Sequence, residues 1–163
     1  MALFEKYLLI KKSKLPNAGK GLFTKIDIPK GKRIVEYKGK LCLWKNVKHL
    51  DGHNGYLMYI TRNAVIDAQP ALTTFGRYAN DANGFGKTPG LKNNCEYVSE
   101  GTKCYIESLR LIKKGEEILV GYGKDFWKLQ RKIRANKKRT DPVLPVRYRN
   151  LRMHSHNPSG MTE

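Results

Sequence analysis

Residues 111–123 read Leu111-Ile112-Lys113-Lys114-Gly115-Glu116-Glu117-Ile118, then Leu119-Val120, then Gly121-Tyr122-Gly123. Short apolar runs bounded by turn residues are typical of β-strands, and both Tyr105–Ile112 and Glu117–Gly121 fit that description. Lys113-Lys114-Gly115 has the composition of a turn between them. The segment therefore predicts two strands joined by a tight turn.

The same pattern extends upstream. Side chains alternate in polarity over Ile34–Lys38, Ala64–Ala68 is a further strand candidate, and Pro29-Lys30-Gly31 and Asp51-Gly52 have turn composition. Many short strands separated by turns predict a mainly β, or β-rich α+β, fold.

Two helices are predicted beside these strands. The longer one begins near Asp125, whose carboxylate can cap it. A shorter one is predicted within residues 43–55. In the longer helix the apolar residues recur at helical spacing and share one face, at Phe126, Leu129 and Ile133, whereas Lys128, Arg131 and Lys132 lie elsewhere on the helix. In the shorter helix the apolar residues at helical spacing are Trp44, Val47 and Leu50.

The length of 163 residues fits one compact domain. We expect this domain in residues 1–127, followed in 128–163 by a basic helix and a flexible tail that Pro142 and Pro145 interrupt. No apolar run approaches the ~20 residues that span a bilayer, and Glu5 and Lys6 break the N-terminal one. An intracellular protein without a membrane segment or signal peptide is expected, in the cytoplasm, or in the nucleus of a eukaryote.

The chain is strongly basic, with 32 Lys and Arg against 14 Asp and Glu and a net charge of +18. Residues 128–163 form the densest basic region, with 10 basic and 2 acidic side chains. Such a charge attracts polyanions or acidic protein surfaces, and nucleic acid or nucleoprotein is the candidate partner of this region. The alternative is that the charge only keeps the protein soluble.

The cysteines and histidines predict no metal site. Three cysteines without a CxxC pair favour buried, inert thiols over a disulfide framework or a zinc cluster. The histidines have no neighbouring ligands and are expected on the surface. The residues concerned are Cys42, Cys95, Cys104, His49, His53, His154 and His156.

Two further features are ambiguous when taken singly. Gly19-Lys20-Gly21-Leu22-Phe23 has the glycine spacing of a tight turn or a close backbone approach, but lacks the third glycine of a dinucleotide fingerprint. An aromatic residue in a strand-like segment is by default a core residue. This description fits Tyr37, Tyr56, Tyr97 and Tyr122.

The order of the segments is more specific than any one of them, because together it resembles that of a SET domain from about Lys14 to Trp127. The segments, in order, are Gly19–Phe23, Asp27–Gly31 with Glu36-Tyr37-Lys38-Gly39, Tyr56–Ile60 with Val65–Ala68, Gly76–Ala82 with Asn94-Cys95, and Leu111–Ile118 with Gly121-Tyr122-Gly123. The resemblance implies small curved sheets and a chain end that passes through a preceding loop to form a pseudoknot, followed by a C-terminal helix.

The resemblance also implies an enzyme that transfers a methyl group from S-adenosylmethionine to a lysine of a protein, leaving S-adenosylhomocysteine. A lysine has a pKa near ~10.4, so its amine must lose a proton before it attacks. An apolar channel beside a cationic sulfonium favours that loss, and hydroxyl groups then align the amine.

The residue roles are likewise those implied by the resemblance. Tyr122 is the first catalytic candidate, Tyr37 would line the same channel, and Tyr97 would limit the number of methyl groups added, whereas the small Val120 would leave room for them. The cofactor-binding candidates are Gly19, Lys20, Gly21, Tyr56, Arg77, Asn80, Asp81, Tyr122, Phe126 and Trp127.

Several positions depart from the family's pattern. Asp81 and Ala82 stand where histidine and serine are usual, which removes contacts that help hold the pseudoknot. Residues 83–92 form a longer connection than is common. The sequence has neither of the cysteine-rich zinc modules that flank the domain in many histone-directed members, so the C-terminal helix is expected to close the lysine channel.

Three functions compete at this point. The first is an active protein-lysine methyltransferase whose substrate is a histone or another basic nucleic-acid-associated protein. The second is an inactive SET-like module that binds protein or nucleic acid through its basic surface. The third is a small basic β-barrel that binds RNA, for which Tyr56–Arg62 is a faint match. The presence of Tyr37, Asn80 and Tyr122 together favours the enzyme.

Overall fold

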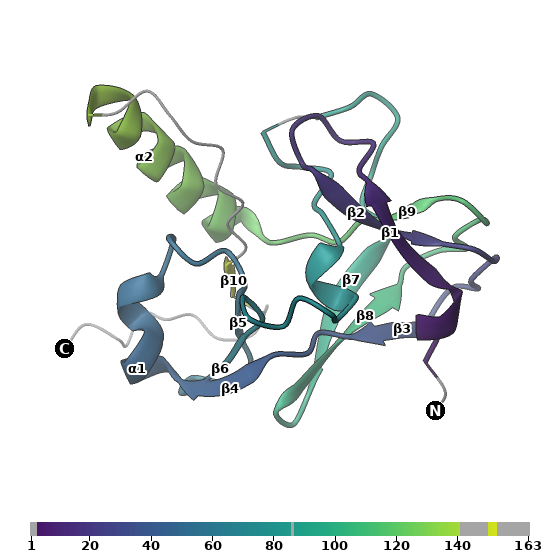
Figure 1. The fold of residues 1–163 in the computed structure, drawn as a ribbon, viewed down its shortest axis with the longest axis horizontal. Helices are drawn as coiled ribbons and strands as arrows, with labels where there is room; N and C mark the ends of the chain where they lie inside the picture. The colour runs from purple at the N-terminus through teal and green to yellow at the C-terminus, as the bar shows by residue number, and fades with distance from the viewer. Residues whose placement is uncertain (1–2, 86, 141–149, 153–163) are drawn as a thin grey trace. The chain divides into compact units, whose positions relative to one another are not determined.

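The computed structural model describes residues 3–85, 87–140 and 150–152, with side chains up to residue 137. The chain divides into two compact units, one made of residues 1–38 and 71–121 and the other of residues 39–70 and 122–163. The described strands form three small sheets, and one long helix, α2, lies near the C-terminus (Figure 1). This arrangement confirms the predicted mainly β class.

The first unit begins with an antiparallel sheet of β1 (Leu8–Lys12), β2 (Lys20–Thr24) and β9 (Glu117–Ile118), preceded by the short helix η1 (Glu5–Tyr7). Nearly all of β2 is buried, including Leu22 and Phe23. The turn between β1 and β2 contains Gly19 at a φ of 65°, a conformation that glycine adopts without strain.

A second antiparallel sheet of the same unit has the order β3–β8–β7, with β3 at Arg33–Glu36, β8 at Lys103–Ser108 and β7 at Cys95–Glu100. Alternate residues of β8, such as Cys104 and Ile106, are buried, as the two-residue period of a half-buried strand requires. The 3-10 helix η3 (Gly76–Tyr78) completes the elements of this unit.

Residues 117–120 run between two segments that a single loop joins. Val120 N donates to Asn80 O at 2.8 Å on one side, and Cys95 N donates to Leu119 O at 2.9 Å on the other. Both bridges are parallel, at Asn80–Leu119 and at Cys95–Val120. The closing segment therefore lies within the 80–95 loop, as the expected pseudoknot requires.

The second unit contains a sheet of order β10–β5–β6–β4, formed by Asn150–Arg152, Leu57–Tyr59, Ala64–Asp67 and Lys40–Leu43. β10 and β5 are parallel, and the other pairs are antiparallel. The helices α1 (Trp44–Val47) and η2 (Lys48–Leu50) confirm the short helix predicted in residues 43–55. Val47, Leu57 and Val65 form a core cluster in this unit.

The helix α2 spans Lys124–Thr140 and so begins near Asp125, as predicted. Asp125 therefore lies in the first turn and does not cap the helix, although a carboxylate there still complements the helix macrodipole. None of the described helices is long and apolar enough to span a bilayer.

The strand boundaries differ from the predicted ones in several places. β8 ends at Ser108, and Ile112 forms an isolated bridge with Ile28. Among the four tyrosines expected in strand-like segments, Tyr97 is the one within a strand. Within the predicted tail the structure describes residues 150–152, which form β10, whereas the rest of the tail, with His154 and His156, lies outside the described residues. The domain boundary at residue 127 stays a prediction.

Candidate functional site

Three of the motif segments meet at Asn80 in the first unit. Asn80 is 7% exposed, and its Nδ2 donates to Lys20 O at 3.0 Å and lies 3.3 Å from Glu117 Oε1. These contacts join the glycine turn, the Gly76–Ala82 segment and the closing segment. The structure thus brings two predicted cofactor-binding residues, Lys20 and Asn80, together with a carboxylate that was not predicted.

Glu117 is the buried centre of this cluster, with 3% of its surface exposed. Ser13 Oγ donates to its Oε1 at 2.6 Å, and Lys14 N donates to its Oε2 at 2.8 Å. A Cβ at position 21 would lie 2.2 Å from Glu117 Oε1. The missing side chain of Gly21 therefore makes room for this carboxylate, and the predicted contact of Gly21 with a cofactor stays a prediction.

The charge of Glu117 distinguishes this cluster from an ordinary buried network. Within the described part of the chain, no lysine or arginine side chain forms an ion pair with it. A buried carboxylate held by neutral donors favours a positively charged ligand nearby. A ligand with an ammonium or sulfonium group fits this donor set.

Asp81 and Ala82, the residues that depart from the family's pattern, make contacts of their own. Asp81 is 5% exposed, and its Oδ1 accepts hydrogen bonds of 2.8 Å from Asn93 Nδ2 and from Asn83 N. Ala82 N donates to Asn93 Oδ1 at 2.8 Å. The two ends of the connecting loop are therefore fastened to each other by Asp81 and Asn93.

Arg77 is a buried cation in η3, and its guanidinium lies 5.4 Å from the ring centroid of Tyr78. The preceding Gly76 packs on the main chain after β3, where a Cβ would lie 2.8 Å from Glu36 O and 3.1 Å from Tyr37 Cα. This close approach explains the glycine and holds η3 against the segment that carries Tyr37.

Tyr37 and Tyr97 lie side by side in the first unit. Their ring centroids are 5.9 Å apart with an edge-to-face angle of 80°, and the two side chains are 1% and 6% exposed. Tyr37 N donates to Cys104 O at 2.7 Å, which anchors the first tyrosine beside β8. The structure thus pairs two of the three predicted catalytic tyrosines.

The third tyrosine, Tyr122, belongs to an aromatic cluster in the second unit. Its ring stacks on Trp127 at 5.8 Å with an interplanar angle of 12°, and it meets Phe126 edge to face at 5.1 Å. Tyr56, the remaining predicted residue of this unit, precedes β5, where its carbonyl accepts from Ala68 N at 3.1 Å.

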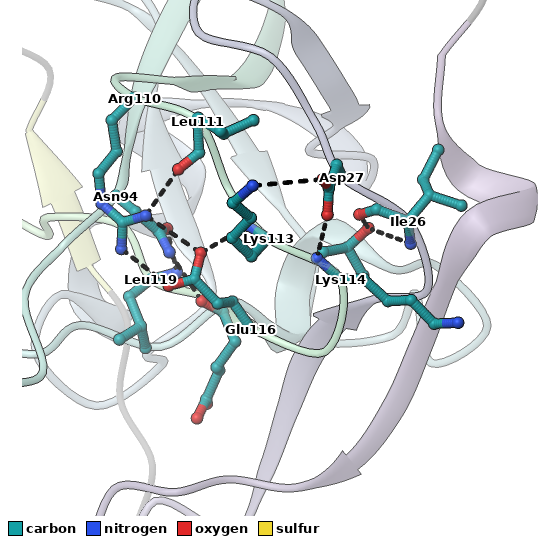
Figure 2. Close-up of polar contacts among 11 residues, drawn as sticks. Ile26, Asp27, Asn94, Arg110, Leu111, Lys113, Lys114, Glu116 and Leu119 are labelled. Carbon is teal, nitrogen blue, oxygen red and sulfur yellow. Dashed lines mark hydrogen bonds and ion pairs between the residues drawn. The ribbon is translucent and has the colours of Figure 1, made fainter.

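Asn94 is a structural residue to which the sequence interpretation gave no role. Its Oδ1 accepts from Leu119 N at 2.9 Å and its Nδ2 donates to Glu117 O at 2.8 Å, so its amide pairs with the closing segment as a strand would. Asn94 lies beside Leu119 in Figure 2. No local pattern singles out Glu117, because Ile118, Leu119 and Val120 are all apolar and buried, and alternation therefore does not tell which way the carboxylate faces.

Two carboxylates fix the loop that leads into the closing segment (Figure 2). Glu116 accepts from Arg110 at 3.0 and 3.2 Å and from Lys113 N at 2.7 Å. The Arg110 hydrogen bond, followed by that of Lys113 N, lowers the pKa of Glu116. The hydrogen bond from Lys114 N, at 2.7 Å, is the main cause that lowers the pKa of Asp27.

The cysteines follow the predicted pattern in part. All three are reduced, Cys95 and Cys104 are buried, and Cys42 is half-buried. Burial raises the pKa of Cys104 to about 12 and that of Cys95 further. His49 and His53 are exposed, as expected. In the parts of the chain that the structure describes, no three His, Cys, Asp or Glu side chains gather as a metal site would require.

Comparison with known proteins identifies the family. The SET domain model matches residues 19–123, which include each of the motif segments from Gly19–Phe23 to Gly121-Tyr122-Gly123. The chain belongs to the SET-domain family. The SET fold expected from the sequence is thereby confirmed. The described strands form three small sheets in place of the closed barrel of the RNA-binding hypothesis.

Several relatives of this SET domain are named histone-lysine N-methyltransferases. The chain is 29% identical to set-17 of Caenorhabditis elegans over 118 residues, and the match covers 72% of the chain and 41% of that protein. It is 34% identical to ASHH3 of Arabidopsis thaliana over 124 residues, covering 69% of the chain and 32% of that protein. The chain thus spans less than half the length of these relatives.

A solved structure with a similar fold is a humanized mutant of the Chaetomium thermophilum Polycomb Repressive Complex 2 bound to the inhibitor GSK126. The match has a TM-score of 0.58 and a sequence identity of 25%, and it covers 76% of this chain and 16% of the chain in that structure. The EZH2 histone-lysine N-methyltransferase of the same organism is 27% identical over 139 residues, which cover 78% of this chain and 9% of that protein.

Proposed function

We propose that this SET domain transfers a methyl group from S-adenosylmethionine to the ε-amine of a lysine in a protein. The observation that carries the proposal is the hydrogen-bonded cluster of Lys20, Asn80 and Glu117, which unites three family motifs around a buried carboxylate that forms no ion pair with any described residue. S-adenosylmethionine, when bound, supplies an electrophilic methyl group on a positively charged sulfur. The buried carboxylate suits the charge of such a ligand.

In this proposal the glycine turn and Asn80 hold the methionine part of the cofactor. The Asn80 amide already fixes the Lys20 carbonyl, so the turn needs little rearrangement when a ligand binds. Gly19, Gly21, Arg77 and Asp81 shape and brace this end of the site. Tyr56, Phe126 and Trp127 contribute further contacts, the two aromatic residues beside Tyr122 by covering flat or apolar groups.

In this proposal Tyr37, Tyr97 and Tyr122 contact the lysine side chain of the substrate. A buried environment disfavours the charged ammonium, so the substrate amine gives up its proton to solvent without a strong base. The hydroxyl of Tyr122 orients the neutral amine, and those of Tyr37 and Tyr97 line its approach. Alignment of this kind contributes to catalysis by removing rotational freedom before the reaction.

The substrate we propose is a histone or another lysine-rich protein that binds nucleic acid, inside the cell. The support is twofold, since the relatives are named histone-lysine N-methyltransferases and the chain carries a net charge of +18. Two positively charged proteins repel each other, so nucleic acid bound to the substrate would assist their encounter.

The test is a methylation assay with labelled S-adenosylmethionine on histones, ribosomal proteins and a lysate of the source cells, followed by mass spectrometry of labelled bands. We expect methyl-lysine on a basic protein, and the mass of the product gives the number of methyl groups. Absence of label together with absence of cofactor binding would favour the inactive binding module.

A further inference from the structure

The outward face of α2 carries a row of exposed cations, with Asp125 as the one carboxylate beside them. Lys124, Lys128, Arg131 and Lys132 are all exposed, and their spacing of three, four and eight residues places them on one side of the helix. Asp125 is the one acidic residue in the sequence of the helix. These four cations form what we call the α2 basic face.

The opposite side of the helix is fixed by packing within the second unit. Gln130 Nε2 donates to Gly52 O at 3.2 Å, and both Phe126 and Gln130 are buried. A Cβ on Gly52 would lie 2.6 Å from Ile133 Cδ1 and 3.0 Å from Leu129 Cδ2. Because these contacts fix the rotation of α2 about its axis, the basic face is held outward.

The charges on this face oppose the stability of the helix. Like charges four residues apart, as in Lys124 with Lys128 and Lys128 with Lys132, destabilise a helix by about 0.2–0.5 kcal/mol per pair. Lys124 also places a cation at the N-terminal end of the macrodipole. Among the described residues none of the four cations forms an ion pair. A row that weakens its own helix indicates an anionic partner.

We propose that the α2 basic face binds the phosphate backbone of nucleic acid. Lys124 to Lys132 extend over about 12 Å at 1.5 Å per residue, and duplex DNA presents one phosphate charge per ~1.7 Å of its axis. Several phosphates therefore lie within reach of the four cations. This inference rests on the proposed function, because binding of nucleic acid would bring the enzyme to lysine-rich substrates that are themselves bound to nucleic acid. The inference adds which residues make that contact.

The experiment is a titration by fluorescence anisotropy of a labelled DNA duplex and a labelled single-stranded RNA, at several salt concentrations. The variant is Lys124→Gln with Lys128→Gln and Lys132→Gln. The matched control is Lys30→Gln with Lys32→Gln and Lys103→Gln, which removes the same charge from exposed sites of the other unit. Glutamine has nearly the helix propensity of lysine, so α2 should persist, as circular dichroism would verify.

We expect the α2 variant to bind DNA or RNA at least about tenfold more weakly at moderate salt. The slope of log K against log salt should fall by about 0.9 for each phosphate that the variant no longer neutralises, while the control should change by less than about threefold. Preference for duplex or single strand identifies the source of the phosphates. Equal losses in both variants would overturn the inference, as would stronger binding of a polyglutamate peptide than of either nucleic acid.

The two proposals can fail separately. Both variants are also assayed for methylation of a short lysine peptide that carries no nucleic acid. Loss of DNA binding with normal peptide methylation supports the inference and the enzyme together. Nucleic-acid binding by a chain that never methylates would overturn the proposed enzyme and leave the α2 basic face in place.

Discussion

Asn93 and Asp81 are linked by a hydrogen bond of 2.8 Å between Asn93 Nδ2 and Asp81 Oδ1. The same Asn93 side chain accepts from Ala82 N, and its Nδ2 would lie 3.4 Å from a Cβ on Gly121. The link therefore joins the two ends of the loop around the closing segment and touches the residue before Tyr122. Asp81 and Ala82 are the two positions at which the sequence departs from the family's pattern, and both take part in this link.

Asn93→Ala should lower the free energy of unfolding by about 1–3 kcal/mol, because it leaves the buried Asp81 with one donor fewer and Ala82 N without its acceptor. Urea unfolding followed by fluorescence measures the change. Asn83→Ala is the control, since the Asn83 side chain is exposed and its contact to Asp81 comes from the main chain. Equal effects of the two substitutions would mean that the link contributes no stability.

Glu117→Gln should weaken the binding of S-adenosylmethionine by about tenfold, because it removes the negative charge of the cluster and turns one acceptor into a donor. Calorimetric titration measures the dissociation constant. The matched control is Glu116→Gln, which removes a half-buried carboxylate that Arg110 already neutralises. An unchanged dissociation constant in Glu117→Gln would contradict a cationic ligand at this position.

Acid should destabilise the fold partly through Glu116 and Asp27, whose pKa values are lowered from 4.5 and 3.8. A carboxyl whose pKa is lower in the folded protein than in the unfolded chain stabilises the fold at every pH above its unfolded pKa. That contribution is lost as the pH falls through the folded pKa. Stability should therefore fall progressively below about pH 4.5.

Arg110→Gln should flatten this acid dependence, because it removes the main cause of the lowered pKa of Glu116. The measurement is the thermal unfolding temperature of each variant between about pH 3 and about pH 6. The control is Arg62→Gln, which changes an exposed arginine of the other unit. If the two variants retain the same pH dependence as the unmodified protein, the Arg110–Glu116 pair has no role in it.

Thiol reactivity should separate the three cysteines. The thiolate is the reactive form, so the raised pKa values of the buried Cys95 and Cys104 should make them slow toward Ellman's reagent, whereas the half-buried Cys42 should react first. Denaturation should make all three react at one rate. Rapid modification of Cys104 in the native protein would show that β8 opens easily.

Much of the fold can be predicted because its signals are local. The turn at Lys113-Lys114-Gly115, the helix at Trp44 and the apolar spacing of α2 depend on neighbouring residues. The sequence pattern does not reveal β1 (Leu8–Lys12), because its apolar part is the short run Leu8-Leu9-Ile10, which two lysines follow, and it shows no alternation. The predicted cap of the long helix is wrong, although its predicted start is right, because a carboxylate at Asp125 suits both a cap and a first turn.

The site is less predictable because its contacts join distant parts of the chain. Ser13 and Glu117 are separated by 104 residues, and their hydrogen bond leaves no periodic signal in the sequence. The sequence alone shows Asp81 as a departure from the family, because its partner, Asn93, follows a connection of unusual length. The motif order identifies the family, whereas the network that supports Asn80 requires coordinates.

The central claim is most directly tested by comparing Tyr122→Phe with the unmodified protein for cofactor binding and for single-turnover methylation of a lysine substrate. Loss of one aligning hydroxyl should slow the reaction by about 10–100-fold, with a cofactor dissociation constant within about threefold of the original. An unchanged rate in Tyr122→Phe would contradict the role of its hydroxyl in aligning the amine. No detectable binding of S-adenosylmethionine to the unmodified protein, or no methylation by it, would contradict the assignment of this chain as a lysine methyltransferase.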